Sequence, residues 1–252
     1  MIGSIALASG KGGVGKTVLA VSLAHALVRK GARVLVVDVD LGLANVDVQL
    51  GLVDDRHLGR ALAEGRPLAE MVVRDPQTGL DLLLGPSGWR SLAALQGEAL
   101  ERLAREIEIL AGGYDAALFD LPAGIGPRTL RLARLARRVL LVATPEPTAL
   151  TDAYALLKVG LKDHAGLGLV VNMAEDRADG LGAAHTLVAT ARRFLDRELP
   201  VVGVVRRDPR VADAIARQRP LLARHPTAPA ASDVEELARS LLGGERDLRP
   251  PG

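Results

Sequence analysis

The feature of this chain that most restricts its fold is a regular alternation of short apolar runs with longer helical patterns. A strand without a polar side is typical of a parallel sheet that helices cover on both faces. The expected strands are 2–8, 32–39, 80–85, 114–120, 138–144, 167–172 and 199–205. The expected helices are 17–30, 58–71, 97–111, 126–137, 148–163, 181–197, 209–218 and 232–242. Right-handed crossovers then predict a doubly wound α/β fold with a mostly parallel sheet in three layers.

We expect residues 1–252 to form one domain, because no linker-like low-complexity stretch and no internal repeat interrupts the alternation. The last expected helix has a readable start, since Ser232 and Glu235 are spaced as a capping box. Two glycines at 243 and 244 would end that helix. Residues 244–252 are expected to be a loose tail.

A glycine-rich loop follows the first expected strand, at the edge of a parallel sheet where ligands bind. Residues 10–17, GKGGVGKT, satisfy the pattern G-x-x-x-x-G-K-[ST] and precede a helical pattern. Backbone N–H groups of such a loop turn toward phosphate oxygens, and the helix N-terminus adds positive charge. The residues expected to contact phosphate are Gly10, Gly12, Gly13, Val14, Gly15, Lys16 and Thr17. Lys16 would neutralise the β- and γ-phosphates, and the Thr17 hydroxyl would ligate Mg²⁺.

Acidic residues end two of the other expected strands. Asp120 closes the run ALFD, where a carboxylate can hold the water shell of magnesium. Asp38 and Asp40 end the run VVDVD and project to the same side of an extended chain, toward the neighbouring loop. A carboxylate there can orient or deprotonate an attacking water. Asp38 fits equally well as a strand-end turn residue.

The loop also contains a second lysine, Lys11, in a chain that has only five lysines among 32 basic residues. GKGGVGKT with lysine at its second position resembles the deviant Walker A motif of the MinD/ParA ATPases. The segments 38–52, 119–126 and 144–158 resemble the switch I, switch II and post-strand segments of that family. The similarity extends over nearly the whole chain. Within the family, GLANVDVQLGL, EPTALTDAYALLK and RQRPLLARHP are most similar to the flagellar-number ATPases FlhG and FleN.

This resemblance implies a cytoplasmic, ATP- and Mg²⁺-dependent homodimer that hydrolyses ATP slowly. Such a switch would regulate the number or placement of a cellular structure, above all the flagellum, through a regulatory protein partner. A ParA-type DNA or cargo-partitioning ATPase and a MinD-type division-site ATPase stay open as alternatives. We see no second group of residues for the small-substrate pocket of a metabolic enzyme, and the chain lacks the cysteines of iron–sulfur carriers.

The resemblance also implies residue roles. Lys11 would cross a two-fold interface to the phosphates bound by the other subunit. Asp40 would position the hydrolytic water, and Mg²⁺ would be held by Thr17, Asp40 and Asp120. The remaining roles are Gly124 as a hinge, Asp152 near Lys11, Asn172 at adenine, and Arg206, Arg207 and Asp208 near the base.

Charge gives little sign of a nucleic-acid or membrane partner. The formal net charge is only +2. The arginine-rich run RTLRLARLARR at 128–138 drifts around a helix, and we interpret it as a solvated face in preference to a DNA surface. The C-terminal helix begins with acidic residues and has no aromatic ones, so we expect Val234, Leu237, Leu241 and Leu242 to face the core. Peripheral association with the inner membrane and nonspecific DNA binding stay open.

Overall fold

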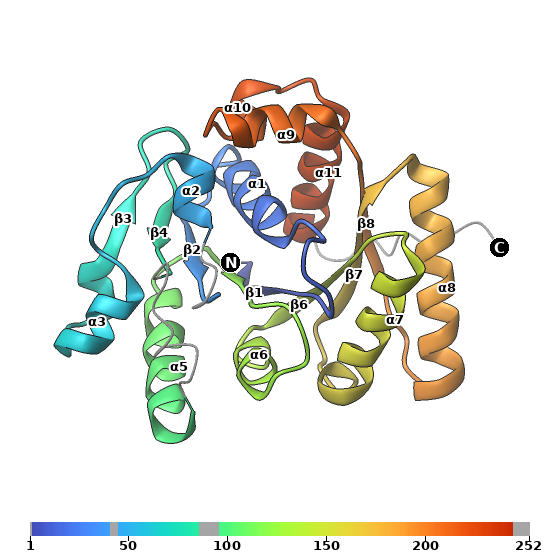
Figure 1. Ribbon diagram of the computed structural model, residues 1–252, viewed down its shortest axis with the longest axis horizontal. Helices are drawn as coiled ribbons and strands as arrows, with labels where there is room; N and C mark the ends of the chain where they lie inside the picture. The colour runs from blue at the N-terminus through green and yellow to red at the C-terminus, as the bar shows by residue number, and fades with distance from the viewer. Residues whose placement is uncertain (1, 41–44, 86–95, 244–252) are drawn as a thin grey trace.

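The computed structural model describes residues 2–40, 45–85 and 96–243, and these contain one sheet of eight strands in the order β3-β4-β2-β5-β1-β6-β7-β8 (Figure 1). The strands are β1 (Gly3–Ala8), β2 (Val34–Asp38), β3 (Val72–Arg74), β4 (Asp81–Leu83), β5 (Ala116–Asp120), β6 (Arg138–Ala143), β7 (Leu167–Ala174) and β8 (Val201–Arg206). Neighbouring strands pair in parallel except β3 with β4. The predicted fold class is confirmed.

Helices cover both faces of the sheet (Figure 1). The α-helices are α1 (Lys16–Val28), α2 (Val46–Leu50), α3 (Leu58–Glu64), α5 (Gly97–Ala111), α6 (Pro127–Ala133), α7 (Pro147–Leu156), α8 (Arg177–Leu195), α9 (Pro209–Ala216), α10 (Leu221–Arg224) and α11 (Pro229–Gly243). A 3-10 turn, η1 (Leu68–Met71), follows α3 after a short break, and a π-helical turn, η2 (Leu157–Leu161), continues directly from α7.

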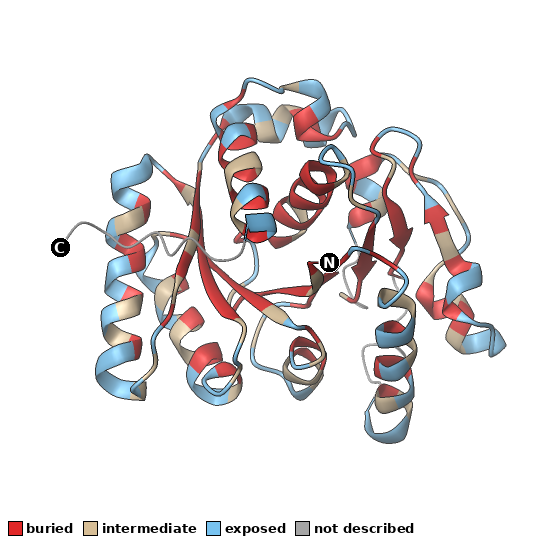
Figure 2. Cartoon of the chain, turned by 180° about the vertical axis from the view of Figure 1, so that it is seen from behind, coloured by how far each residue is buried: buried red, intermediate tan, exposed pale blue. Residues whose placement is uncertain are grey.

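The core consists of two apolar clusters, one on each side of the sheet. In β1, Ile5 and Leu7 pack toward α1 and α11, whereas Ala6 and Ala8 pack toward α5, α6, α7 and α8. This alternation follows from the two-residue period of a strand. The strands are buried along most of their length, and α5 and α8 are buried along the side that packs on the core and exposed along the other (Figure 2). Both faces of the central strands are therefore dry, which explains the near-continuous apolar runs.

Four elements differ from the expectations. The expected helix 58–71 is broken at Gly65, a C-cap with φ 65°, and the chain then passes through Pro67 into η1. Strand β3, antiparallel at the sheet edge, was not predicted, and neither were the short helices α2 and α10. Segments of three to five residues complete too few periods to show a pattern.

The C-terminal helix starts earlier than expected. α11 begins at Pro229, so the predicted capping box at Ser232 is wrong, and the Ser232 N–H already donates within the helix region to Ala228 O. Val234, Leu237 and Leu241 are buried as expected, but Leu242 is exposed. Residues 244–252, predicted to be a tail, lie outside the described residues. In the described ranges, no helix combines the length and the apolar character that crossing a membrane requires.

Candidate functional site

The glycine-rich loop joins β1 to α1, and Gly15 with φ 81° is the N-cap of α1. A Cβ at Gly15 would lie 2.5 Å from Asn172 Nδ2, so only glycine fits here. Gly10 is restricted in another way, because a Cβ there would lie 2.0 Å from the carbonyl oxygen of Asp152 in α7. The loop is thus held between α7 and the end of β7, with its N–H groups at the start of α1. This is the arrangement that binds phosphate.

Lys16 and Thr17 are the first residues of α1, and their side chains reach the end of β5. Lys16 is buried, which lowers its pKa, while the charges of Asp120 and Asp40 act to raise that pKa. Thr17 Oγ1 donates a hydrogen bond of 2.6 Å to Asp120 Oδ2. Lys16, Thr17 and Asp120, which were expected to share the phosphate and magnesium site, therefore lie close together.

Asp120 has the environment of a ligand-binding carboxylate. Burial raises its pKa to about 6, against the opposing effects of the Thr17 hydrogen bond and the Lys16 charge. Its Oδ1 is buried and has no hydrogen-bond partner among the described residues. An unpartnered carboxylate oxygen beside a threonine hydroxyl fits Mg²⁺, which prefers oxygen ligands and keeps several waters. Within 2–40, 45–85 and 96–243 there is no cluster of three or more His, Cys, Asp or Glu side chains for a metal, so the ion would also need phosphate oxygens.

Asp38 ends β2 directly opposite Asp120 in the sheet register. Its carboxylate accepts hydrogen bonds from the backbone N–H groups of Asp40 (3.1 Å), Asn45 (3.1 Å) and Val46 (3.3 Å). Burial, and then the charge of Asp120, raises the pKa of Asp38 to about 8. Asp38 thus has the strand-end turn role that was one of its two expected roles. Its contact with a nucleotide stays a prediction.

Asp40 follows Asp38 at the mouth of the site. Its charge acts to raise the pKa values of Lys16, Asp120 and Arg128, which places its carboxylate among these groups. The expected position beside the phosphate loop agrees with this, while its role toward water stays a prediction. Gly124, expected to be a hinge, donates its N–H to Ser9 O at 2.8 Å.

Arg128 was missed as a site residue because it begins the arginine-rich run. It lies at the start of α6, and burial lowers its pKa although the charge of Asp40 opposes this. Other arginines of the run are also tied to the protein: Arg131 pairs with Glu101 through two bonds of 2.6 Å, and Arg138 donates to Leu241 O. Arg134 and Arg137 are exposed, as expected for a solvated face, whereas Arg128, Arg131 and Arg138 are partly buried.

Lys11 lies on the outer side of the loop, with 38% of its side chain exposed. Its Nζ donates to Glu146 Oε2 and to Thr148 Oγ1, both at 3.0 Å, at the start of α7. Asp152, which the resemblance placed near Lys11, is close to the loop through its backbone at Gly10. The two lysines of the loop therefore face different surroundings.

A cavity of about 290 Å³ lies beside the loop, between α1, the ends of β7 and β8, and α9. Asn172 lines it, and its Nδ2 donates to Val14 O at 2.8 Å. Met173 also lines it, in a left-handed conformation with φ 58° at an irregular point of β7. No local sequence pattern predicts this left-handed conformation of Met173. Asn172 is thus positioned between the loop and the cavity, and its contact with adenine stays a prediction.

Arg206, the last residue of β8, and Asp208 make contacts that stabilise the fold. Arg206 makes two side-chain bonds to Asp233 of α11, at 2.9 and 2.8 Å, so its guanidinium is directed to that helix. Arg207 donates its backbone N–H to Ala174 O, and its side chain is exposed. Asp208 caps α9 by accepting from Arg210 N at 2.9 Å. A base contact of Arg206 is not supported by this geometry.

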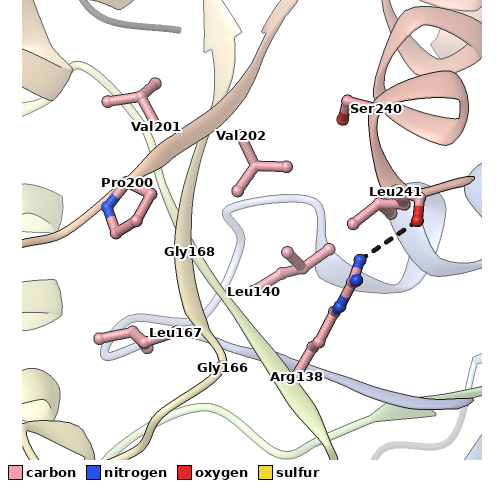
Figure 3. A pocket seen from close by; sticks show the side chains of 10 residues that line it. All are labelled: Arg138, Leu140, Gly166, Leu167, Gly168, Pro200, Val201, Val202, Ser240 and Leu241. Atoms are coloured by element: carbon pink, nitrogen blue, oxygen red, sulfur yellow. Dashed lines mark hydrogen bonds between the residues drawn. The ribbon is translucent and has the colours of Figure 1, made fainter. Parts of the chain in front are cut away.

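A second cavity lies at the opposite edge of the sheet, where β6, β7 and β8 begin (Figure 3). Its walls include Leu140, Leu167 and Val201, and Arg138 at one side donates to Leu241 O at 3.2 Å (Figure 3). Its volume of about 30 Å³ is enough for one or two water molecules. It is too small for a nucleotide, and the larger cavity is the candidate.

Comparisons with known proteins identify the family of the chain. The family model described as cellulose biosynthesis protein BcsQ matches residues 2–242. The chain is 37% identical to the antiactivator FleN of Pseudomonas aeruginosa, covering 98% of this chain and 89% of FleN. It is 36% identical to the flagellum site-determining protein YlxH of Helicobacter pylori, covering 80% of this chain and 68% of YlxH.

Among solved structures, the septum site-determining protein MinD of Pyrococcus horikoshii, complexed with Mg-ADP, superposes with a TM-score of 0.79. It is 28% identical, and the match covers 96% of this chain and 97% of that one. The expected resemblance is thus confirmed: the chain belongs to the BcsQ/ParA–MinD family of P-loop ATPases.

Proposed function

We propose that this protein is a dimeric, ATP-hydrolysing switch that regulates the number or placement of flagella. The observation that carries the proposal is the different placement of the two loop lysines. Lys16 is buried between Asp120 and Asp40, so it serves the nucleotide of its own subunit. The Lys11 side chain is 38% exposed and donates to Glu146 and Thr148, and this supports a role in which it leaves its own subunit.

Each subunit would bind the phosphates with its loop N–H groups and Lys16. Thr17 and Asp120 would hold Mg²⁺, which when bound neutralises phosphate charge. Asp40 would orient the attacking water. Lys11 of the partner would stabilise the charge that develops on the transferring group, as an arginine finger does, and such a finger is worth about 10³–10⁵ in rate. Dimer formation then requires Lys11 to exchange Glu146 and Thr148 for the partner's phosphates.

The flagellar assignment is supported by the matches to FleN and YlxH, which extend over 98% and 80% of this chain. FleN is named an antiactivator, so we propose that the ATP-bound dimer binds a regulatory protein. The structural likeness to MinD favours division-site placement as the second candidate. DNA partitioning has less support, because Arg131 and Arg138 are engaged within the fold.

Two measurements test this function. Asp40→Ala, with an intact phosphate loop, is expected to bind ATP without hydrolysing it and to be a dimer by light scattering in ATP and a monomer in ADP. A monomer under saturating ATP would contradict the switch. In the source organism, loss of the gene is expected to change the number or position of flagella, and the wild-type gene but not Lys11→Ala should restore it. Unchanged flagella with misplaced division sites would favour the MinD-type alternative.

A further inference from the structure

Among the residues that line the cavity beside the phosphate loop is Ser22 of α1, whose side-chain hydroxyl is buried and has no hydrogen-bond partner in the described residues. The other polar side chains of the wall are different: Asn172 donates to Val14 O, Arg206 is paired with Asp233, Asp208 caps α9, and Arg207 is exposed. Ser22 is 2% exposed. Its Oγ is buried and has no partner within residues 2–40, 45–85 and 96–243.

This hydroxyl differs from other helical hydroxyls of the same chain. Serine and threonine inside helices commonly donate to a carbonyl one turn back. Thr151, Thr186 and Thr190 do so, to Pro147 O, Gly182 O and Thr186 O at 2.7–3.1 Å. Ser22 does not make this local bond. Because buried hydroxyls are almost always paired, an unpaired one calls for a partner that arrives from outside the chain.

Ser22 is also in the right place for a ligand held at the loop. Gly15, Val18 and Ser22 are spaced by three and four residues, so they lie along one face of α1, and all three line the cavity. The cavity therefore extends from the phosphate loop to about two turns along the helix. A ligand whose phosphates are bound at the loop can place its other end against Ser22, and a turn about χ1 lets the hydroxyl reach it.

The residues that line the cavity indicate the chemistry of the ligand's non-phosphate end. Val18, Leu19, Val205, Val211 and Ile215 make it apolar, and the charge of Arg206 is balanced by Asp233. A volume of about 290 Å³ is at the lower limit of small-molecule pockets, which suits a flat ring system better than a whole nucleotide. A neutral aromatic ring with hydrogen-bonding atoms at its edge is a nucleobase.

We propose that Ser22 binds the base of the nucleotide, with its hydroxyl hydrogen-bonded to the edge of the purine. The inference rests on the proposed function, since it assumes a nucleotide at the loop. It assigns base recognition in part to α1, the same helix that carries Lys16 and Thr17. The hydroxyl is then unpaired in the free protein and paired in the complex.

The test compares ATP with tripolyphosphate, which has the phosphates and no base. By calorimetry in Mg²⁺, Ser22→Ala is expected to weaken ATP binding about 2- to 12-fold, the value of one hydrogen bond, and to leave tripolyphosphate binding unchanged. Without nucleotide, its thermal midpoint should equal or exceed that of the wild type, because an unpaired buried hydroxyl is removed. Ser240→Ala is the matched control: Ser240 Oγ donates to Leu237 O at 2.9 Å, so this variant should lose stability and keep its ATP affinity.

The outcomes separate the two proposals. Wild-type ATP affinity in Ser22→Ala, or an equal loss for ATP and tripolyphosphate, overturns the role of Ser22 while leaving the proposed function intact. A lowered thermal midpoint with unchanged ATP affinity shows that Ser22 is structural and also overturns it. If the wild-type protein binds neither ATP nor tripolyphosphate, the proposed function fails, and the inference fails with it.

Discussion

Replacing Gly15 by alanine tests whether the phosphate loop is held in shape by the end of β7. Gly15 has φ 81°, in the left-handed region. Its Cβ would lie 2.5 Å from Asn172 Nδ2 and 2.9 Å from Met173 Cε. Asn172 donates to Val14 O, so an alanine at 15 must displace the amide that secures the loop.

Two costs follow from this geometry. A left-handed alanine is unfavourable by roughly 1–2 kcal/mol. Losing the bond between Asn172 and Val14 adds about 0.5–1.5 kcal/mol. Gly13→Ala is the matched control, because Gly13 has φ 80° but a Cβ there meets nothing within 4 Å. The change in unfolded-chain entropy is the same for both variants and cancels between them.

We therefore expect Gly15→Ala to lower the free energy of unfolding by about 0.5–1.5 kcal/mol more than Gly13→Ala. Urea unfolding without nucleotide, followed by circular dichroism, measures this difference. The double variant Gly15→Ala/Asn172→Ala should cost less than the sum of its single changes, since the clash partner is gone. Equal losses for Gly15→Ala and Gly13→Ala would refute the contact between loop and strand.

Three further predictions concern buried charge. Arg206→Ala leaves the buried Asp233 carboxylate without its main partner, so it should cost about 1–3 kcal/mol in urea unfolding, less than for a fully buried pair, with ATP affinity unchanged. Burial lowers the pKa of folded His25, so the unfolded chain takes up its proton first. The contribution of neutral His25 to the free energy of unfolding is then complete above the ordinary histidine pKa of 6.5 and falls as the pH drops below it. Unfolding curves measured over a series of pH values should show a smaller loss of stability in His25→Gln. Asp120→Asn should raise the thermal midpoint of the free protein by removing a buried, poorly paired carboxyl, while Mg²⁺-dependent ATP binding falls about tenfold or more in calorimetry.

The parts of the fold that the sequence predicted are those with strong local patterns. The β5 run ALFD is buried on both faces, and so its apolar character marked it clearly. Strand β3 has three residues and exists because β4 pairs with it, which no local pattern shows. The start of α11 was placed three residues late, because the Ser232 and Glu235 spacing matched a cap while Pro229 begins the helix.

The contacts of the candidate site also differ in whether the sequence could predict them. The contact of Thr17 with Asp120 was predictable, since both positions follow from the loop motif and from the edge where parallel strands end. The bond of Asn172 to Val14 and the pairing of Arg206 with Asp233 depend on how distant segments pack. In the sequence, Ser22 was one polar position in a helical pattern, because the cavity beside it exists only in the folded chain.

The most direct test of the central claim, that Lys11 acts on the nucleotide of the partner subunit, mixes two inactive variants. Lys11→Ala and Asp40→Ala are each expected to hydrolyse ATP at least about 10³-fold more slowly than the wild type. In a mixed dimer, the Lys11→Ala subunit keeps its own Asp40 and receives Lys11 from its partner.

ATPase activity of the mixture should therefore recover to about a quarter of the wild-type rate, because half of the dimers are mixed and each has one complete site. Mixing Lys11→Ala with Lys11→Ala/Asp40→Ala, which supplies no lysine, should give no recovery. A wild-type rate in Lys11→Ala alone, or a mixture no faster than its components, would contradict the shared site.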